Sequence, residues 1–185
     1  YLDYADKMAR KAYFNKNNQD ELDFMWYLWC GEKSPLSGRR IKTFERTFID
    51  DKNAIYFMGV ESNAKQNLEN FSKSIISYHT GMDTETSFLS CQAALEYVFK
   101  LSEKERIILA IDEYPYVARS SKSLASTIQL LIDQYKDTSK LMLILCGSSI
   151  SYMEDHVLAY KAPLYGRRTA QMKILPFDFE ETCHY

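Results

Sequence analysis

The chain has 185 residues, of which 46% are apolar and 26% charged, close to the averages for soluble globular proteins. Its formal net charge is -2, so the chain as a whole has no basic field of the kind that attracts nucleic acid or anionic membranes. The length suits one domain with a substantial core. We therefore expect residues 1–185 to form a single domain, with roughly the first 13 residues at its periphery.

The cysteines and histidines argue against a zinc site. The sequence has three histidines and four widely spaced cysteines that form no CxxC pair: Cys30, Cys91, Cys146 and Cys183. Reduced thiols in the cytoplasm are the expectation that follows. No apolar stretch approaches the ~20 residues that span a bilayer, and the first residues lack a signal-peptide core, so we expect no membrane association.

The first half of the chain alternates helical and strand patterns. Asn18 and Glu21 resemble a capping box, and Leu22, Met25, Trp26 and Trp29 then share a face, which predicts a helix that ends at Gly31. The pattern next predicts a strand over residues 54–60 and a helix from Ala64 to Tyr78. A polar loop, HTGMDTETS, follows that helix.

The second half continues the alternation. The predicted elements are a helix over 91–101, the buried strand RIILAID, a loop YPYVARSSKS, a helix over 124–135, the buried strand LMLILCGSS, a short helix, and a last strand MKILPF stopped at Pro176. Helices that alternate with continuous apolar strands predict an α/β fold, a three-layer α/β/α architecture with a mainly parallel sheet.

Ligands bind open parallel sheets beyond the carboxyl ends of the strands, so the residues that follow the apolar runs matter most. Asp112 and Glu113 come directly after the run that ends at Ile111. One carboxylate of such a pair can hold a magnesium ion through its water shell, while the other orients and deprotonates an attacking water. The alternative is an acidic pair that is solvated or caps the next helix.

The strand that ends at Leu145 is followed by Cys146, Gly147, Ser148 and Ser149. A serine hydroxyl at this strand end can contact a γ-phosphate or the attacking water. The alternative is an ordinary helix N-cap, for which serine is a preferred residue.

SGRRIKT, residues 37–43, is a partial match to a phosphate-binding loop. The pattern GxxxxGK[ST] surrounds phosphates with backbone N–H groups, while its lysine reaches the β- and γ-oxygens and its hydroxyl binds Mg²⁺. Gly38, Lys42 and Thr43 are present, but three residues separate Gly38 from Lys42 where the pattern needs five, including a second glycine. The alternative is a basic surface turn.

Two adjacent arginines, Arg167 and Arg168, precede the last predicted strand in the segment YGRRT. Arginine pairs in such loops can contact phosphate, in the same chain or across a subunit contact. A solvated basic turn is the alternative.

These segments together resemble a known group. IILAIDEYPYVA, LMLILCGSSISYMED and APLYGRRTAQMKILPF, in this order and spacing, look like the archaeal-type ATPase family of the AAA-type P-loop superfamily. The resemblance covers the C-terminal part of the chain and extends more loosely back through NAIYFMGVESNAKQNLENFSKSI. It implies a cytoplasmic ATPase that hydrolyses ATP to ADP and phosphate with Mg²⁺ and works as a conformational switch.

The resemblance also implies roles for single residues. Asp112 would be the magnesium-associated carboxylate, Glu113 the catalytic base, and Ser148 or Ser149 the sensor hydroxyl. Arg167 or Arg168 would sense phosphate. Lys42 would be the loop lysine and Thr43 a metal ligand, with Gly38, Arg39 and Arg40 completing the cradle around ATP.

The chain departs from the family at the phosphate loop. The family has a loop such as GRRxxGKT after a buried strand, whereas this chain has PLSGRRIKT with both strand and loop shortened. Either residues are missing there, or the protein has lost its cradle and is a non-hydrolysing nucleotide-binding or protein-interaction scaffold. We also expect the chain to lack the family's lid and C-terminal effector region. A homo-oligomer or a protein client fits the family, and DNA is implied only by analogy.

Overall fold

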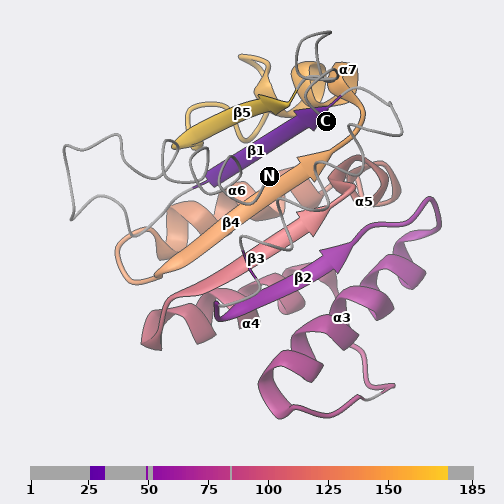
Figure 1. The fold of residues 1–185 in the computed structure, drawn as a ribbon, viewed down its shortest axis with the longest axis vertical. Coiled ribbons are helices and arrows are strands. Elements are labelled where there is room, and N and C mark those ends of the chain that lie inside the picture. Colours follow the sequence, from indigo (N-terminus) through magenta and orange to yellow (C-terminus); the bar gives the residue numbers. More distant parts are fainter. Residues whose placement is uncertain (1–25, 32–48, 50–51, 84, 175–185) are drawn as a thin grey trace, which may run out of the picture.

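The computed structural model describes residues 26–31, 49, 52–83 and 85–174. These residues form a sheet of five strands in the order β2-β3-β4-β1-β5. Every neighbouring pair is parallel, so all five arrows in Figure 1 point the same way. The predicted α/β fold with a mainly parallel sheet is confirmed.

The strand β1, Trp26–Gly31, lies inside the sheet, where it pairs with β4 on one side and β5 on the other. The sequence analysis assigned these residues to a helix, and that prediction is wrong. Leu22, Met25, Trp26 and Trp29 do fit a helical face, but Tyr27, Leu28 and Cys30 are apolar too. A continuous apolar run of this length also suits a strand between two neighbours, and pairing with β4 and β5 decides between them. The strand before SGRRIKT, which the sequence analysis described as shortened, has six residues.

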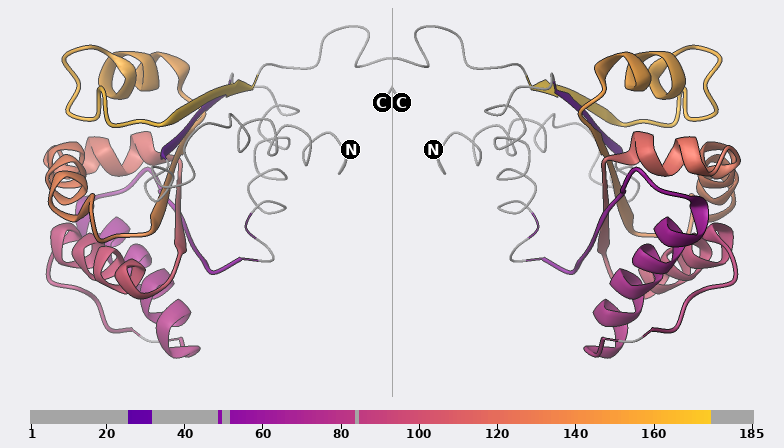
Figure 2. Two further views of the ribbon diagram at one scale, coloured as in Figure 1. Left: turned by 90° about the vertical axis from the view of Figure 1, so that its left-hand side faces the viewer. Right: turned by 90° about the vertical axis from the view of Figure 1, so that its right-hand side faces the viewer.

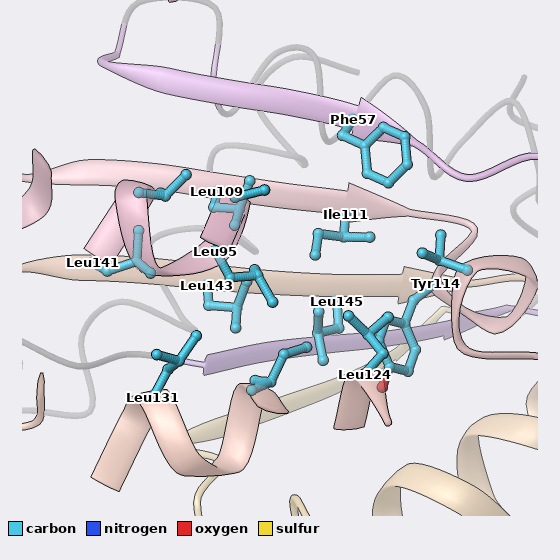
Figure 3. Close-up of a cluster of buried hydrophobic side chains, with 14 of the residues drawn as sticks. Phe57, Leu95, Leu109, Ile111, Tyr114, Leu124, Leu131, Leu141, Leu143 and Leu145 are labelled. Atoms are coloured by element: carbon cyan, nitrogen blue, oxygen red, sulfur yellow. The ribbon is translucent and has the colours of Figure 1, made fainter. Parts of the chain in front are cut away.

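The strands β3, Ile107–Asp112, and β4, Leu141–Gly147, are buried at every position, which confirms the prediction from their continuous apolar runs. Alternate residues of both strands belong to one hydrophobic core together with β2, Ala54–Met58. Figure 3 shows part of this core, in which Leu109, Ile111, Leu143 and Leu145 lie between the strands and the helices. The sheet is therefore held by burial along both of its central strands.

The described helices cover one face of the sheet (Figure 2). The long ones are α3, Ala64–Thr80, α4, Cys91–Lys104, and α6, Leu124–Tyr135, close to the predicted ranges. Asn63 and Ser90 cap α3 and α4 by accepting hydrogen bonds from backbone N–H groups in the first turns. Gly81 ends α3 with a φ of 68°, the left-handed conformation that glycine adopts most readily.

The segment after β3 is a short helix, α5, Tyr114–Ser120, where the sequence analysis expected a loop. Pro115 occupies the first turn of α5, a place where proline's missing N–H costs nothing, so the proline that suggested a loop instead begins a helix. The predicted short helix after β4 is α7, Ile150–Met153, which continues as the π-helical turn η1, Glu154–Leu158.

The last described strand is β5, Ala170–Ile174, which pairs with β1. It confirms the strand predicted in MKILPF, although it begins two residues earlier. The predicted stop at Pro176 lies outside the described residues.

The burial of β4 predicts a large difference between two leucines. Leu143 is 0% exposed, whereas Leu130 on α6 is 56% exposed. We expect Leu143→Ala to lower the free energy of unfolding by about 2–5 kcal/mol because it leaves a cavity in the core. Leu130→Ala, the matched control, should change it by no more than about 0.5 kcal/mol. Urea denaturation followed by circular dichroism measures both, and equal effects would contradict this account of the core.

Candidate active site

The carboxyl ends of β3 and β4 lie side by side. Ile111 pairs with Leu145 in the parallel register, so the residues that follow each strand emerge at the same edge of the sheet. These residues are Asp112 and Glu113 from β3 and Ser148 from β4. The register thus brings together two of the clusters that the sequence singled out.

Asp112 is 4% exposed, and both of its carboxylate oxygens accept a hydrogen bond. The backbone N–H of Glu113 donates to Oδ1 at 2.8 Å. The Tyr56 hydroxyl, from the neighbouring strand β2, donates to Oδ2 at 2.6 Å. These two contacts fix the carboxylate in one orientation at the end of the buried strand.

Glu113 has a left-handed backbone, with φ 50° and ψ 40°, which costs a non-glycine residue of order 1–3 kcal/mol. Although Glu113 occupies the N-cap position of α5, its side chain makes no capping hydrogen bond. Its Oε2 instead accepts a hydrogen bond from the Ser148 hydroxyl at 3.1 Å. The helix-cap interpretation of the acidic pair therefore fails for Glu113, whose carboxylate is turned toward β4.

Two glycines allow the backbone to pass close to this pair. A Cβ on Gly59, just after β2, would come within 2.4 Å of Val117 Cγ2 and 2.8 Å of the Glu113 carbonyl oxygen. The N–H of Gly59 donates to the Asp112 carbonyl at 2.8 Å. A Cβ on Gly147 would meet Pro115 Cδ at 2.7 Å. The turn that carries Asp112 and Glu113 is thus enclosed by β2 and β4, and both approaches require glycine.

The two serines after β4 have different roles. Ser148 contacts Glu113, as described above. Ser149 is the N-cap residue of α7, where its carbonyl accepts from the Met153 N–H at 3.0 Å and its side chain makes no capping bond. The structure therefore favours Ser148 over Ser149 as the hydroxyl that belongs to the site.

The structure does not bring Arg167 and Arg168 to this edge. They precede β5, which lies three strands from β3, about 14 Å at ~4.8 Å per strand. Arg167 donates to both carboxylate oxygens of Asp133 on α6, at 2.9 and 2.7 Å. Arg168 donates to the Leu158 carbonyl and lies 5.6 Å from the centre of the Tyr165 ring. Within one molecule, both arginines brace the segment that leads into β5.

The residues proposed for the phosphate loop, Gly38, Arg39, Arg40, Lys42 and Thr43, lie outside the described residues. The end of the preceding strand is described. Cys30 pairs with Gly147, so β1 ends at Gly31 beside the point where β4 leads to Ser148. The backbone therefore leaves β1 at the same edge of the sheet as Asp112 and Glu113.

The sequence analysis missed Tyr56 and Gly59. Both lie in AIYFMGV, which was recognised only as a strand. The sequence does show that Tyr56 and Met58 share a face of β2, because side chains alternate along a strand. In the structure Met58 pairs with Asp112, which places Tyr56 near that carboxylate. Which neighbour β2 would have could not be known from one sequence, so the hydrogen bond to Asp112 could not be foreseen.

The oxygen atoms at this edge suit a magnesium ion. The Asp112 and Glu113 carboxylates and the Ser148 hydroxyl are hard oxygen ligands. Each Asp112 oxygen accepts one hydrogen bond from the described residues, and a carboxylate oxygen can accept two. Within residues 26–31, 49, 52–83 and 85–174, no three His, Cys, Asp or Glu side chains gather as a metal site. Magnesium is commonly held by one or two carboxylates, waters and substrate phosphates, so the residues fit it.

The fold is that of the P-loop ATPases, with the three-layer α/β/α arrangement. The Walker-type ATPase of Pyrococcus abyssi aligns over 100% of this chain and 56% of its own, with a TM-score of 0.66 and 17% identity. At this level of sequence identity the structural similarity establishes the fold only. The activity has to be argued from the residues of the site.

Sequence comparison gives two different relatives. An uncharacterized protein of Methanocaldococcus jannaschii is 32% identical over 132 residues, which is 71% of this chain and 28% of that protein. The class 3 fructose-1,6-bisphosphatase of Clostridium botulinum is 53% identical over 57 residues, 28% of this chain and 8% of that enzyme. The model of the Firmicute fructose-1,6-bisphosphatase family matches residues 1–88. The chain thus spans less than a third of either relative.

The phosphatase family match covers residues 1–88, which include Gly38, Lys42 and Thr43 as well as β1, β2 and α3. It provides a second account of SGRRIKT, as part of a segment shared with another enzyme family. The phosphate-loop assignment therefore depends on residue types whose spacing departs from GxxxxGK[ST].

In the part of the chain that the structure describes, none of the helices combines the length and the apolar character that crossing a membrane requires.

The Arg167–Asp133 ion pair predicts a pH-dependent contribution to stability. The hydrogen bonds from Arg167 lower the pKa of Asp133 below its ordinary value of 3.8. A carboxylate with a lowered pKa stabilises the fold above its unfolded pKa, and this is lost as the pH falls through the folded value. We expect Asp133→Asn to lower the free energy of unfolding by about 1 kcal/mol or less at pH 7, because the pair is partly exposed. The difference from wild type should shrink below about pH 4 in urea denaturation, and a difference that grows there would contradict the assignment.

Proposed function

We propose that this chain binds ATP with Mg²⁺ and hydrolyses it to ADP and phosphate, and that the described residues supply the half of the site that activates water. The observation that carries this proposal is the hydrogen bond from Ser148 to Glu113 beside the buried Asp112. Three groups with distinct chemistry converge at the carboxyl edge of a parallel sheet, where such sheets bind ligands.

Each residue has a separate role in the proposal. Glu113 accepts a proton from the attacking water, and Ser148 orients the Glu113 carboxylate through its hydroxyl. Asp112 holds the magnesium ion through the oxygen positions that its two hydrogen bonds leave open. Magnesium, when bound, would neutralise charge on the phosphate oxygens. The held backbone of Glu113 keeps its carboxylate beside β4, so that little reorganisation is needed when nucleotide binds.

The phosphate cradle is proposed to follow β1. Gly38, Arg39, Arg40, Lys42 and Thr43 are the residues offered for it, with Lys42 at the β- and γ-oxygens and Thr43 at the metal. Support comes from β1, whose carboxyl end lies beside β4. The residues that follow β1 therefore start at the correct edge of the sheet, although their spacing departs from GxxxxGK[ST].

The positions of Arg167 and Arg168 suggest which partner molecules the chain would need. Arg167 and Arg168 precede β5 and so lie toward the amino end of that strand, whereas Asp112 and Glu113 lie at the carboxyl end of β3, so we propose that any role of the arginines at phosphate is played at the site of another molecule. We propose a homo-oligomer on this basis, with a cytoplasmic location and a protein client as expectations from the resemblance. DNA association is an expectation by analogy alone.

Glu113→Gln tests the catalytic assignment. The amide keeps the shape of the side chain but cannot accept the proton, so we expect hydrolysis to fall by about 10²–10⁴-fold with Mg·ATP affinity nearly unchanged. Phosphate release and equilibrium binding of a fluorescent ATP analogue measure the two quantities. The control is Glu69→Gln on α3, which should change neither. Full turnover by Glu113→Gln would rule out its role as the base.

Lys42→Ala tests the cradle. If Lys42 donates charge-assisted hydrogen bonds to the phosphates, worth about 1.5–3 kcal/mol, the alanine variant should bind Mg·ATP roughly 10- to 100-fold more weakly. Lys65→Ala on α3, whose ammonium makes an exposed ion pair with Glu69, is the matched control. Equal binding by wild type and Lys42→Ala would remove Lys42 and SGRRIKT from the site.

A second candidate function follows from the phosphatase match. The family match over residues 1–88 and the 53% identity over 57 residues favour a role with sugar phosphates, although the 57 residues correspond to 8% of the enzyme's length. Phosphate release from fructose 1,6-bisphosphate, compared with release from ATP, discriminates the two. Binding of Mg·ATP without hydrolysis of either substrate would favour the non-hydrolysing scaffold.

A further inference from the structure

Among the described residues, the hydroxyl of Tyr56 is the one side-chain donor to Asp112, at 2.6 Å from Oδ2. Tyr56 lies on β2, and Asp112 ends the neighbouring strand β3. Alternation along the two strands puts both side chains on the face opposite to Phe57 and Ile111, which belong to the core beneath the helices. The contact therefore lies on the side of the sheet away from α3 to α6 (Figure 2).

We propose that Tyr56 is a positioning residue for the magnesium-binding carboxylate of Asp112. This inference rests on the function proposed above and assigns to that site a residue from a third strand. Tyr56 acts through Asp112: its hydroxyl holds Oδ2, while the Glu113 N–H holds Oδ1. Partners that orient a metal-binding carboxylate commonly change metal affinity by about 10- to 100-fold when they are removed.

Two hydrogen-bond donors are needed to fix the Asp112 carboxylate in one orientation. The bond from the Glu113 N–H, at 2.8 Å, comes from the adjacent residue and fixes only one carboxylate oxygen. Rotation of the carboxylate about its bond to Cβ is restrained when the second oxygen is held by a different strand. With both oxygens engaged, the remaining acceptor positions keep fixed directions, in which they would be available to a magnesium ion.

The packing of β2 does not by itself call for a hydroxyl at this position. Tyr56 is half-buried, and its neighbours Ile55 and Phe57 supply the core-facing side chains of the strand. A phenylalanine would keep the ring and its β-propensity. Asp112, in contrast, is 4% exposed, so loss of the hydroxyl leaves a carboxylate oxygen without its donor.

The experiment is a magnesium titration of Tyr56→Phe at a fixed, saturating concentration of a fluorescent ATP analogue. We expect the Mg²⁺ midpoint to rise by about tenfold, while affinity for the analogue measured in EDTA stays within about twofold of wild type. The matched control is Tyr160→Phe, which removes a hydroxyl from a side chain that is 80% exposed. All titrations are run at a temperature at which circular dichroism shows each variant to be folded.

A double-mutant cycle separates positioning from a structural role. In an Asp112→Asn background, Tyr56→Phe should leave the Mg²⁺ midpoint unchanged, because the carboxylate that it orients is gone. A drop in the thermal midpoint of Tyr56→Phe with an unchanged Mg²⁺ midpoint would overturn the proposal. So would an equal shift in both backgrounds. If wild type itself shows no magnesium-dependent nucleotide binding, the proposed function fails first, and that result is distinct from either of these.

Discussion

Parallel pairing between β3 and β4 is the constraint on which the site depends. Both strands are buried at every position, so a slip would carry apolar side chains beyond the buried region at one end and draw flanking polar residues into it at the other. The register that burial selects pairs Ile111 with Leu145. Asp112 and Glu113 are thereby brought level with the serines that follow β4. Packing of aliphatic side chains thus sets the position of the polar ones.

The strained backbone at Glu113, together with this register, determines how the side chains of the site are arranged. Glu113 is the single non-glycine residue with positive φ among the described residues. Three contacts hold it there: the Asp112 carboxylate accepts from its N–H, Gly59 packs on its carbonyl, and α5 begins directly after it. Removing any of these would let the backbone relax toward an ordinary conformation and would carry the Glu113 carboxylate away from Ser148. Strain at this point is consistent with a functional turn.

The sequence predicts an element correctly where its spacing of apolar residues fits only one kind of secondary structure. Continuous apolar runs identified β3 and β4, and the residues after them supplied Asp112, Glu113 and Ser148. The same reasoning failed at β1, where helical spacing and a continuous apolar run overlap and only pairing with β4 and β5 decides. It also failed for Tyr56, because a contact between side chains 56 positions apart depends on strand order, which no local pattern encodes. The ion pair of Arg167, a candidate phosphate ligand, with Asp133 on α6 was likewise not visible in the sequence.

The proposed hydrolysis of a nucleotide needs one group of residues that activates water and another that holds phosphate. The residues proposed to activate water are positioned by the register of β3 and β4, and β2 contacts Asp112 through Tyr56 and Gly59. A loop that holds phosphate needs particular glycines, so that its backbone N–H groups can surround the ligand, rather than a particular sheet. The sheet can therefore position the first group although the sequence after β1 departs from GxxxxGK[ST]. Because the proposal assigns Lys42 to the second group and Glu113 to the first, variants of these two residues report on binding and on chemistry separately.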